Sequence, residues 1–306
     1  MIKIKRHIVS AALAACLLTS QAAQNVKSFL NVYDLDTKKT VVVKEFDRRM
    51  EAPNWTPDGG ELVYNDGGKL YRIPVGGGEP VLIPSGSARG CNNDHVISSD
   101  GKWVAFSNDD RGGSRIYVMP FPAGGEPRLV TEKGPSYLHG WTPDMKTLAY
   151  TAKREGDKHF NIYSISDDGS NESRLTSTDA LDDGSEYSAD GKSIWFNSSR
   201  TGVMQVWRMN PDGSGQTQAT FDKTRHAWFP HVSPDGKSLV YMAYKVGDVD
   251  PDAHPPYKDV EILLMDPEGG APRVLLSFFG GQGSFNVNSW APDSRKFAYV
   301  SYGRPE

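Results

Sequence analysis

Residues 230–241 read PHVSPDGKSLVY, and altered copies of this stretch recur along most of the chain. Each copy carries one aspartate at the same place, and these residues are Asp58, Asp100, Asp144, Asp190, Asp235 and Asp293. Successive aspartates lie 42, 44, 46, 45 and 58 residues apart. A repeat of about 40–45 residues is typical of β-propellers, in which each period supplies one blade of four strands. The spacing therefore predicts a propeller.

The local sequence of each copy predicts two strands joined by a tight turn. In the copy around Asp235, Pro234 presets φ and the Asp235 carboxylate can accept a hydrogen bond from the backbone two residues on. Gly236 is free to adopt positive φ. The β-branched and aromatic run 239–241 follows as the second strand. A third strand, a glycine-rich turn and a fourth strand are predicted to complete the period.

The two ends of the chain predict how the ring closes. The copy around Asp293 supplies only two strands, and residues 29–34 and 40–44 supply two more ahead of the first copy. Pairing these segments would complete the last blade and remove exposed strand edges. We therefore expect an all-β fold, a six-bladed β-propeller of four-stranded antiparallel blades closed by two N-terminal strands. Residues 28–306 would form this single domain.

The first 22 residues have the pattern of a signal peptide. Lys3, Lys5 and Arg6 precede the apolar run 8–18, and small residues around Ala22 suit cleavage. The run is too short to span a bilayer, so we expect no transmembrane segment. The mature protein is predicted to be periplasmic or secreted. The residues before Cys16 also resemble a lipoprotein signal, and anchoring through Cys16 is the alternative.

Charge and cysteine content argue against nucleic-acid binding and against a disulfide within the mature chain. The formal net charge of −4 and the pI of about 6.0 give no electrostatic basis for binding nucleic acid. Cleavage after Ala22 would leave only Cys91, so no disulfide can form within the mature chain. We interpret Cys91 as a small buried residue.

The copies resemble the propeller repeats of the TolB family. The similar features are the Pro-Asp-Gly-Lys turn, the Val-Tyr or Ala-Phe strand after it, the Ile-Tyr strand and the Gly-Gly turn. The resemblance covers roughly residues 28–302 and implies a periplasmic propeller with a protein partner. The N-terminal α/β domain of TolB itself has no counterpart in this sequence. Oligogalacturonate lyases, which are metal-dependent propeller enzymes, share this type of repeat, and their likeness implies a carbohydrate-active alternative.

Polar residues gather just before each turn, where the innermost strand of a blade leaves the mouth of the channel. The positions four, five and seven residues before the repeated aspartates include Asn93, His95, Tyr137, His139, Asp183, Glu186, Trp228, His231, Asn286 and Asn288. These columns are more polar than a structural turn requires. We predict that they converge as a polar funnel around the axis, although propeller channels are commonly wet and polar without binding a ligand.

The residue types in this funnel suit several kinds of chemistry. His95, His139 and His231 could hold a divalent metal of the Mn or Zn class, or act as general acid and base. Gln282 enters the same mouth, while Arg111, Arg154 and Arg200 lie in hairpins that could reach over it toward an anionic substrate. Trp228 and Tyr137 could stack on a sugar ring or simply pack between blades.

The last full period is about 14 residues longer than the others. The extra residues fall in the hairpin 247–259, on the predicted funnel face. Long departures from a regular scaffold often carry function. Asp248, Asp250 and Asp252 alternate as in a calcium loop, so Ca²⁺ binding is one interpretation and a solvated acidic loop is the other.

Two functions remain open from the sequence. The first is an exported TolB-like propeller that binds a small-molecule or oligosaccharide ligand, or a periplasmic protein partner, at the channel mouth. The alternative is a carbohydrate-active enzyme, lyase- or hydrolase-like, that acts on an acidic or oxidised sugar through the histidine, carboxylate and arginine groups. The sequence contains no complete catalytic signature that decides between them.

Overall fold

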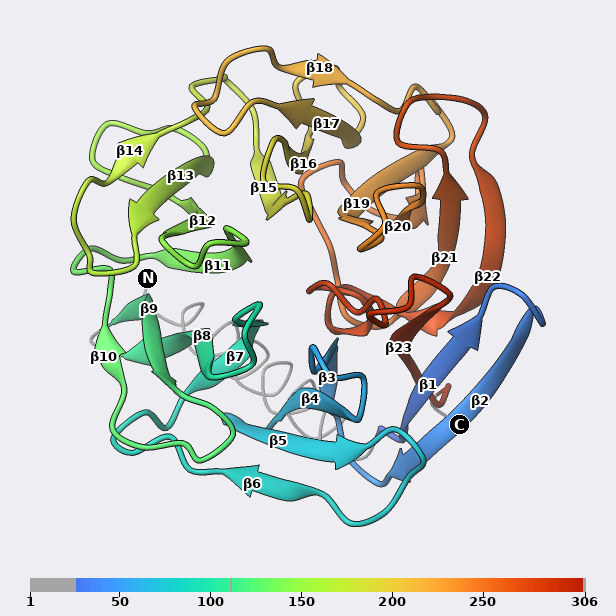
Figure 1. The fold of residues 1–306 in the computed structure, drawn as a ribbon. Coiled ribbons are helices and arrows are strands. Elements are labelled where there is room, and N and C mark those ends of the chain that lie inside the picture. The colour runs from blue at the N-terminus through green and yellow to red at the C-terminus, as the bar shows by residue number, and fades with distance from the viewer. Residues whose placement is uncertain (1–25, 111, 305–306) are drawn as a thin grey trace, which may run out of the picture.

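The computed structural model describes residues 26–110 and 112–304, which form six antiparallel sheets arranged as a ring (Figure 1). Figure 1 looks down the axis of this ring, and the first strand of each four-stranded blade lies nearest the axis. The predicted six-bladed propeller is therefore confirmed. The expected signal peptide at residues 1–22 lies outside the described residues.

Five blades contain four strands each. From the axis outward, blade 1 contains β3 (Glu51–Trp55), β4 (Glu61–Asp66), β5 (Lys69–Pro74) and β6 (Val81–Ile83). Blade 2 contains β7 (Cys91–Ile97), β8 (Trp103–Asp110), β9 (Gly113–Pro120) and β10 (Arg128–Leu129). Blade 3 contains β11 (Ser136–Trp141), β12 (Thr147–Ala152), β13 (Asn161–Ser166) and β14 (Ser173–Arg174).

The next two blades follow the same order. Blade 4 contains β15 (Asp182–Tyr187), β16 (Ile194–Ser198), β17 (Gln205–Met209) and β18 (Thr217–Gln218). Blade 5 contains β19 (Arg225–Val232), β20 (Leu239–Lys245), β21 (Lys258–Met265) and β22 (Arg273–Gly280). The outermost strands of blades 2, 3 and 4 are only two residues long, which leaves little exposed edge there.

Blade 6 joins the two ends of the chain. It contains β23 (Lys296–Tyr302), β1 (Ser28–Asp34) and β2 (Lys39–Phe46), with β1 in the middle. The pairing runs from Ser28 opposite Tyr302 to Asp34 opposite Lys296, so the predicted closure is confirmed. The expected innermost strand is reduced to a bridge between Trp290 and Phe297, preceded by the short 3₁₀ helix η1 (Gln282–Ser284).

The repeated turn is held by two hydrogen bonds to one carboxylate oxygen. Asp235 Oδ1 accepts from Lys237 N–H at 3.1 Å, as predicted, and from Ser233 Oγ–H at 2.7 Å. These bonds hold the pKa of Asp235 below its ordinary value, with the Ser233 hydroxyl as the largest cause. Gly236 has a φ of 72°. The same hydroxyl bond comes from Thr56, Ser98, Thr142 and Ser188 in the other copies.

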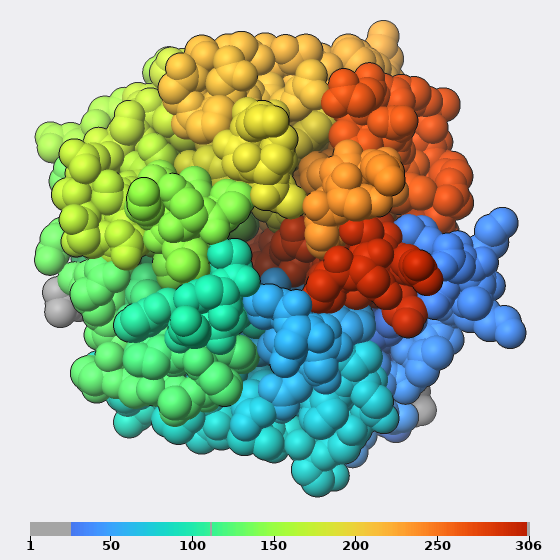
Figure 2. Space-filling view, in the orientation of Figure 1, coloured from blue at the N-terminus to red at the C-terminus, as the bar shows by residue number. Residues whose placement is uncertain are grey.

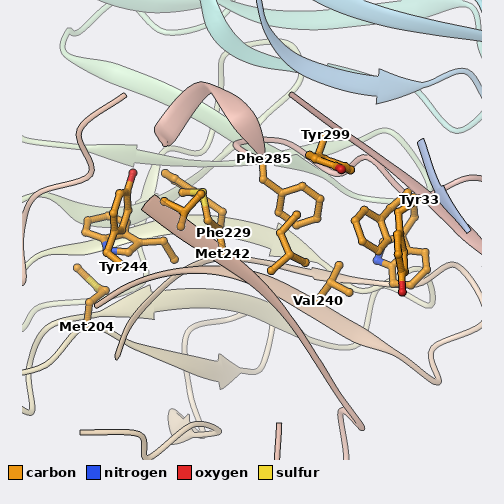
Figure 3. Packing of buried hydrophobic residues seen from close by; sticks show 13 residues of the cluster. Tyr33, Met204, Phe229, Val240, Met242, Tyr244, Phe285 and Tyr299 are labelled. Carbon is orange, nitrogen blue, oxygen red and sulfur yellow. The ribbon is translucent and has the colours of Figure 1, made fainter. Parts of the chain in front are cut away.

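Aromatic side chains fill the space between blades. One buried cluster joins blades 5 and 6, and Figure 3 shows Phe285 among side chains from both of them. Trp228, Phe229 and Phe285 in this cluster are at most 1% exposed. Burying each such side chain stabilises a fold by roughly 1.5–3 kcal/mol. This packing fixes η1 and the residues after it against the channel.

The innermost strands of blades 1 to 5 each carry a β-bulge at about the same place. The pairing shifts between Cys91 and His95 in β7, and between Asp183 and Glu186 in β15. The other shifts lie in β3, β11 and β19. A bulge inserts an extra residue and redirects the side chains around it. The bulges therefore decide which polar residues face the channel.

Candidate functional site

A cavity of about 310 Å³ lies where the innermost strands begin, and we call it the loop-side cavity. It is lined by Asn93, Asp94, Tyr137, His139, Thr151, Phe160, Leu181, Asp183, Asp252, His254 and Gln282. A volume of this size falls within the range of small-molecule sites. The structure thus brings together part of the predicted funnel, including Asn93, Tyr137, His139, Asp183 and Gln282.

An ion pair between two neighbouring blades lies on the wall of this cavity. His139 Nε2 of β11 is 3.0 Å from Asp183 Oδ1 of β15. Burial opposes the charged form of His139, but the Asp183 carboxylate outweighs it and raises the pKa of His139. Burial likewise opposes ionised Asp183, but the His139 charge and hydrogen bond prevail and lower the pKa of Asp183 to about 2. Each group therefore favours the charged form of the other.

Two further donors fix the Asp183 carboxylate. Thr151 Oγ1–H and the Gly184 amide donate to Asp183 Oδ1 at 2.7 and 2.8 Å. Gly184 lies at the bulge with a φ of 64°, and a Cβ there would approach Asn197 Oδ1 to 2.4 Å. Only glycine fits this position without displacing Asn197. The bulge of β15 is thus part of what positions the carboxylate.

Asp94 is a second carboxylate of the cavity, and the sequence columns missed it. Asn286 Nδ2–H donates to Asp94 Oδ1 at 2.6 Å and also lies 3.3 Å from the Asn93 carbonyl oxygen. Burial raises the pKa of Asp94 to about 6, although His139 and the Asn286 hydrogen bond oppose this. Asp94 lies six residues before Asp100, a position that regular strand alternation would direct away from its neighbour Asn93.

The inserted hairpin covers one side of the cavity. Its residues Asp252 and His254 line the cavity, and His254 Nε2 lies 3.8 Å from Asp183 Oδ2. The ring of His254 packs edge-on against Trp228 at a centroid distance of 4.6 Å. Burial lowers the pKa of His254, with Asp183 acting in the opposite direction. Tyr244 Oη–H donates to the Pro255 carbonyl oxygen at 2.8 Å, which ties the hairpin to β20.

A second cavity, of about 340 Å³, lies at the opposite end of the channel, among the Pro-Asp-Gly turns. We call it the turn-side cavity, and Figure 2 shows the hollow at the centre of the ring. His231 Nδ1 lies 2.6 Å from Glu186 Oε2, and Asn288 Nδ2–H donates to Glu186 Oε1 at 2.5 Å. His139 lines both cavities.

Other residues of the predicted funnel lie elsewhere. His95 is wholly buried, and burial lowers its pKa to about 4. Trp228 belongs to the core between blades 5 and 6. Arg154 pairs with Glu172 at 2.7 Å, and Arg200 pairs with Asp182 at 2.9 Å. Neither arginine lines the loop-side cavity.

The two possible metal-ligand sets from the sequence are not gathered as clusters in the described residues. Among residues 26–110 and 112–304, no group of three or more His, Cys, Asp and Glu side chains could hold a metal ion. The structure therefore does not assemble His95, His139 and His231 as one ligand set. It does not assemble Asp248, Asp250 and Asp252 as one either. Arg111 lies outside the described residues.

Comparison with known proteins identifies the family. An uncharacterized protein of Agrobacterium fabrum is 44% identical over 287 residues, which span 93% of this chain and 96% of that protein. A solved structure from Agrobacterium tumefaciens, provisionally assigned to TolB, has a TM-score of 0.86 at 44% identity, covering 92% of this chain and 99% of that one. The family model of the TolB beta propeller domain matches residues 133–254. The chain belongs to the TolB-like β-propeller family.

More distant relatives show where this family likeness ends. The Tol-Pal system protein TolB of Francisella tularensis is 27% identical over 213 residues, which span 67% of this chain but only 48% of that TolB. A solved oligogalacturonate lyase in complex with manganese has a TM-score of 0.51 at 14% identity, covering 82% of this chain and 67% of the lyase. The lyase likeness is one of fold alone. Within the described part of this TolB-like chain, no helix is long and apolar enough to cross a membrane.

Proposed function

We propose that this TolB-like propeller is an exported binding protein whose loop-side cavity holds a small polar ligand. The observation that carries the proposal is the cavity itself, which combines an ion pair, a second carboxylate and an aromatic wall. Tyr137 and Phe160 form that wall, with ring centroids 5.9 Å apart. Binding sites typically combine apolar walls with a few positioned polar groups.

The arrangement favours binding over catalysis. The His139–Asp183 pair resembles an acid–base couple, but Asp183 Oδ1 already accepts from Thr151 and from the Gly184 amide. Such a carboxylate orients and stays ionised rather than exchanging protons near neutral pH. The hydroxyl beside this pair, on Thr151, donates to Asp183, and the pKa of about 2 makes that carboxylate a poor base for activating it. The carbohydrate-active alternative is supported only by the shared fold. A divalent metal for such an enzyme is supported only by the sequence pattern.

The leader pattern and the family support an exported location. The N-terminal basic residues, apolar run and small residues at Ala22 are the features of a secretory signal. We place the mature chain in the periplasm or outside the cell on this basis. Mass spectrometry of the mature N-terminus would separate cleavage after Ala22 from lipid attachment at Cys16.

A cavity-filling variant tests the binding function. Leu181 lines the loop-side cavity, and Leu181→Trp would occupy the space without adding charge. Leu82→Trp is the matched control, because Leu82 is 46% exposed on the outer strand β6. We expect a panel of small amines, amino acids and uronic oligosaccharides to contain a binder, detected by calorimetry, that Leu181→Trp excludes and Leu82→Trp retains. A binder unaffected by Leu181→Trp would place binding elsewhere and refute the proposal.

A further inference from the structure

The charges around the loop-side cavity are unbalanced. Three carboxylates line it, from Asp94, Asp183 and Asp252, whereas its basic side chains are the imidazoles of His139 and His254. Among the described residues that line the cavity, none is lysine or arginine. His139 compensates Asp183 directly at 3.0 Å, and burial holds His254 toward its neutral form by lowering its pKa. The cavity therefore carries a net negative charge.

Asp94 is the buried carboxylate that has no close ion pair within the described residues, although the His139 charge acts on it from farther away. It is 3% exposed, and no ion pair reaches it among residues 26–110 and 112–304. Its Oδ1 accepts from the neutral amide of Asn286, and within the same described ranges no donor reaches its Oδ2. A buried carboxylate without a close cationic partner destabilises the fold unless a partner arrives.

A second, independent feature also lacks its partner. The Nδ1 of His139 is buried and has no hydrogen-bond partner in the described part of the chain, and the residue is only 5% exposed. Nε2 of the same ring faces Asp183, so Nδ1 points away from that carboxylate. The Asp183 carboxylate raises the pKa of His139, and the charged ring that it favours has an N–H at Nδ1 that can donate to an acceptor oxygen.

We infer that the loop-side cavity recognises a small organic ammonium compound that also carries an acceptor oxygen, an inference that rests on the proposed binding function. The ammonium group meets Asp94 and Asp252, and a hydroxyl or carbonyl oxygen of the ligand accepts from His139. Charge-assisted hydrogen bonds of this kind are the strong ones in a partly desolvated site. The faces of Tyr137 and Phe160 accommodate the ligand's apolar part and attract its charge.

The ammonium compound is favoured over a bare metal ion by the composition of the wall. No cluster of three ligating side chains exists among the described residues, whereas one wall of the cavity is aromatic. A divalent ion gains nothing from an aromatic wall and requires several oxygen ligands at short distance. An ammonium group needs only two or three acceptors and tolerates an apolar neighbour.

Calorimetric titration with matched probes tests the inference. Glucosamine is the cationic probe with acceptor oxygens, and spermidine is the cationic control without an oxygen. N-acetylglucosamine and glucuronate are the neutral and anionic counterparts of glucosamine, and calcium chloride represents the metal ion. We expect glucosamine to bind at least about tenfold more tightly than N-acetylglucosamine, a difference typical of one charged hydrogen bond. The affinity should fall as added salt shortens the Debye length below about 8 Å.

Variants locate the binding in this cavity. Asp252→Asn removes a rim carboxylate and is expected to weaken the ammonium probe about fivefold, while Asp47→Asn, on an exposed loop, leaves it unchanged. Equal effects of the two variants would overturn the inference. If glucuronate, a neutral sugar or calcium binds best and Leu181→Trp abolishes it, the binding function stands and the ammonium class is wrong. If no probe binds in a manner sensitive to Leu181→Trp, both proposals fail.

Discussion

Replacing Asp94 with asparagine is expected to stabilise the protein while it removes part of the ligand site. Burial raises the pKa of Asp94 from an ordinary value of 3.8 to about 6. Asparagine has the same shape, and its carbonyl oxygen can still accept the hydrogen bond from Asn286. The variant thus removes a buried charge without opening a cavity or breaking that contact.

The sign and size of the effect follow from proton linkage. The folded pKa of Asp94 lies above the unfolded value, so between about pH 4 and 6 the unfolded chain has released this proton while the folded chain retains it. Wild-type stability therefore falls across this window and stays lower above it. A shift of about two units corresponds to at most about 3 kcal/mol. We expect Asp94→Asn to exceed wild type by roughly 1–3 kcal/mol at pH 7 and to match it near pH 4.

Urea unfolding at a series of pH values measures this difference directly. Asp47→Asn, which makes the same chemical change on an exposed loop, controls for the loss of one negative charge and is expected to stay within about 0.5 kcal/mol of wild type. A variant that is less stable than wild type at neutral pH would refute the reasoning. So would a gain that is constant from pH 4 to 8, because no titrating group would then explain it.

Three further predictions concern the turn, the channel and the ion pair. Met145 has a φ of 61° and occupies the position that Gly236 has in another copy. Met145→Gly should raise the free energy of unfolding in urea by roughly 0.5–1 kcal/mol, whereas Gly236→Ala should lower it by about 1 kcal/mol. Glu186→Ala leaves His231 buried without its carboxylate and should cost about 3 kcal/mol by the same assay. Asp183→Asn should destabilise the protein at pH 7, and its deficit should shrink as pH falls from about 4 toward 2, where wild-type Asp183 protonates.

The architecture could be predicted because its determinants are local and repeated. Each turn around an aspartate such as Asp235 carries its own carboxylate acceptor for a backbone N–H, and four of the six also carry a glycine after the aspartate, so each copy specifies its hairpin independently of the others. The closure by β1 and β2 followed from counting strands at both ends. A further signal was present and not used, since a serine or threonine such as Ser233 precedes five of the aspartates by two residues. The last copy has Ala291 at this position.

The site could be predicted only in part, because bulges break the alternation of side chains. Asn93 and Asp94 are adjacent in β7, and regular alternation would place them on opposite faces. Both line the loop-side cavity because the pairing of β7 shifts between Cys91 and His95. Nothing in the composition of a single strand marks such a bulge. Columns drawn five and seven residues before the turn therefore found Asn93 and His139 and missed Asp94.

Equivalent histidines differ because their neighbours come from other blades. His95 and His139 occupy the same place in consecutive repeats. The pKa of His139 is raised by Asp183 of the next blade, whereas His95 lies wholly buried and its pKa falls to about 4. His254 reaches the same cavity from a hairpin about 70 residues beyond Asp183 in sequence. The repeat spacing aligns equivalent residues, but it does not predict which side chain of the neighbouring blade each of them contacts.

The distribution of charge along the channel indicates which group faces a ligand. Glu186 at the turn side contacts His231 and accepts a hydrogen bond from Asn288, and Asp183 contacts His139. Both carboxylates can be explained by the internal contacts that they make. Asp94 makes no such ion pair within the described ranges, and its ionisation lowers stability at neutral pH. Asparagine would keep the shape of Asp94 without this loss of stability. The carboxylate is therefore best explained by contact with a bound ligand.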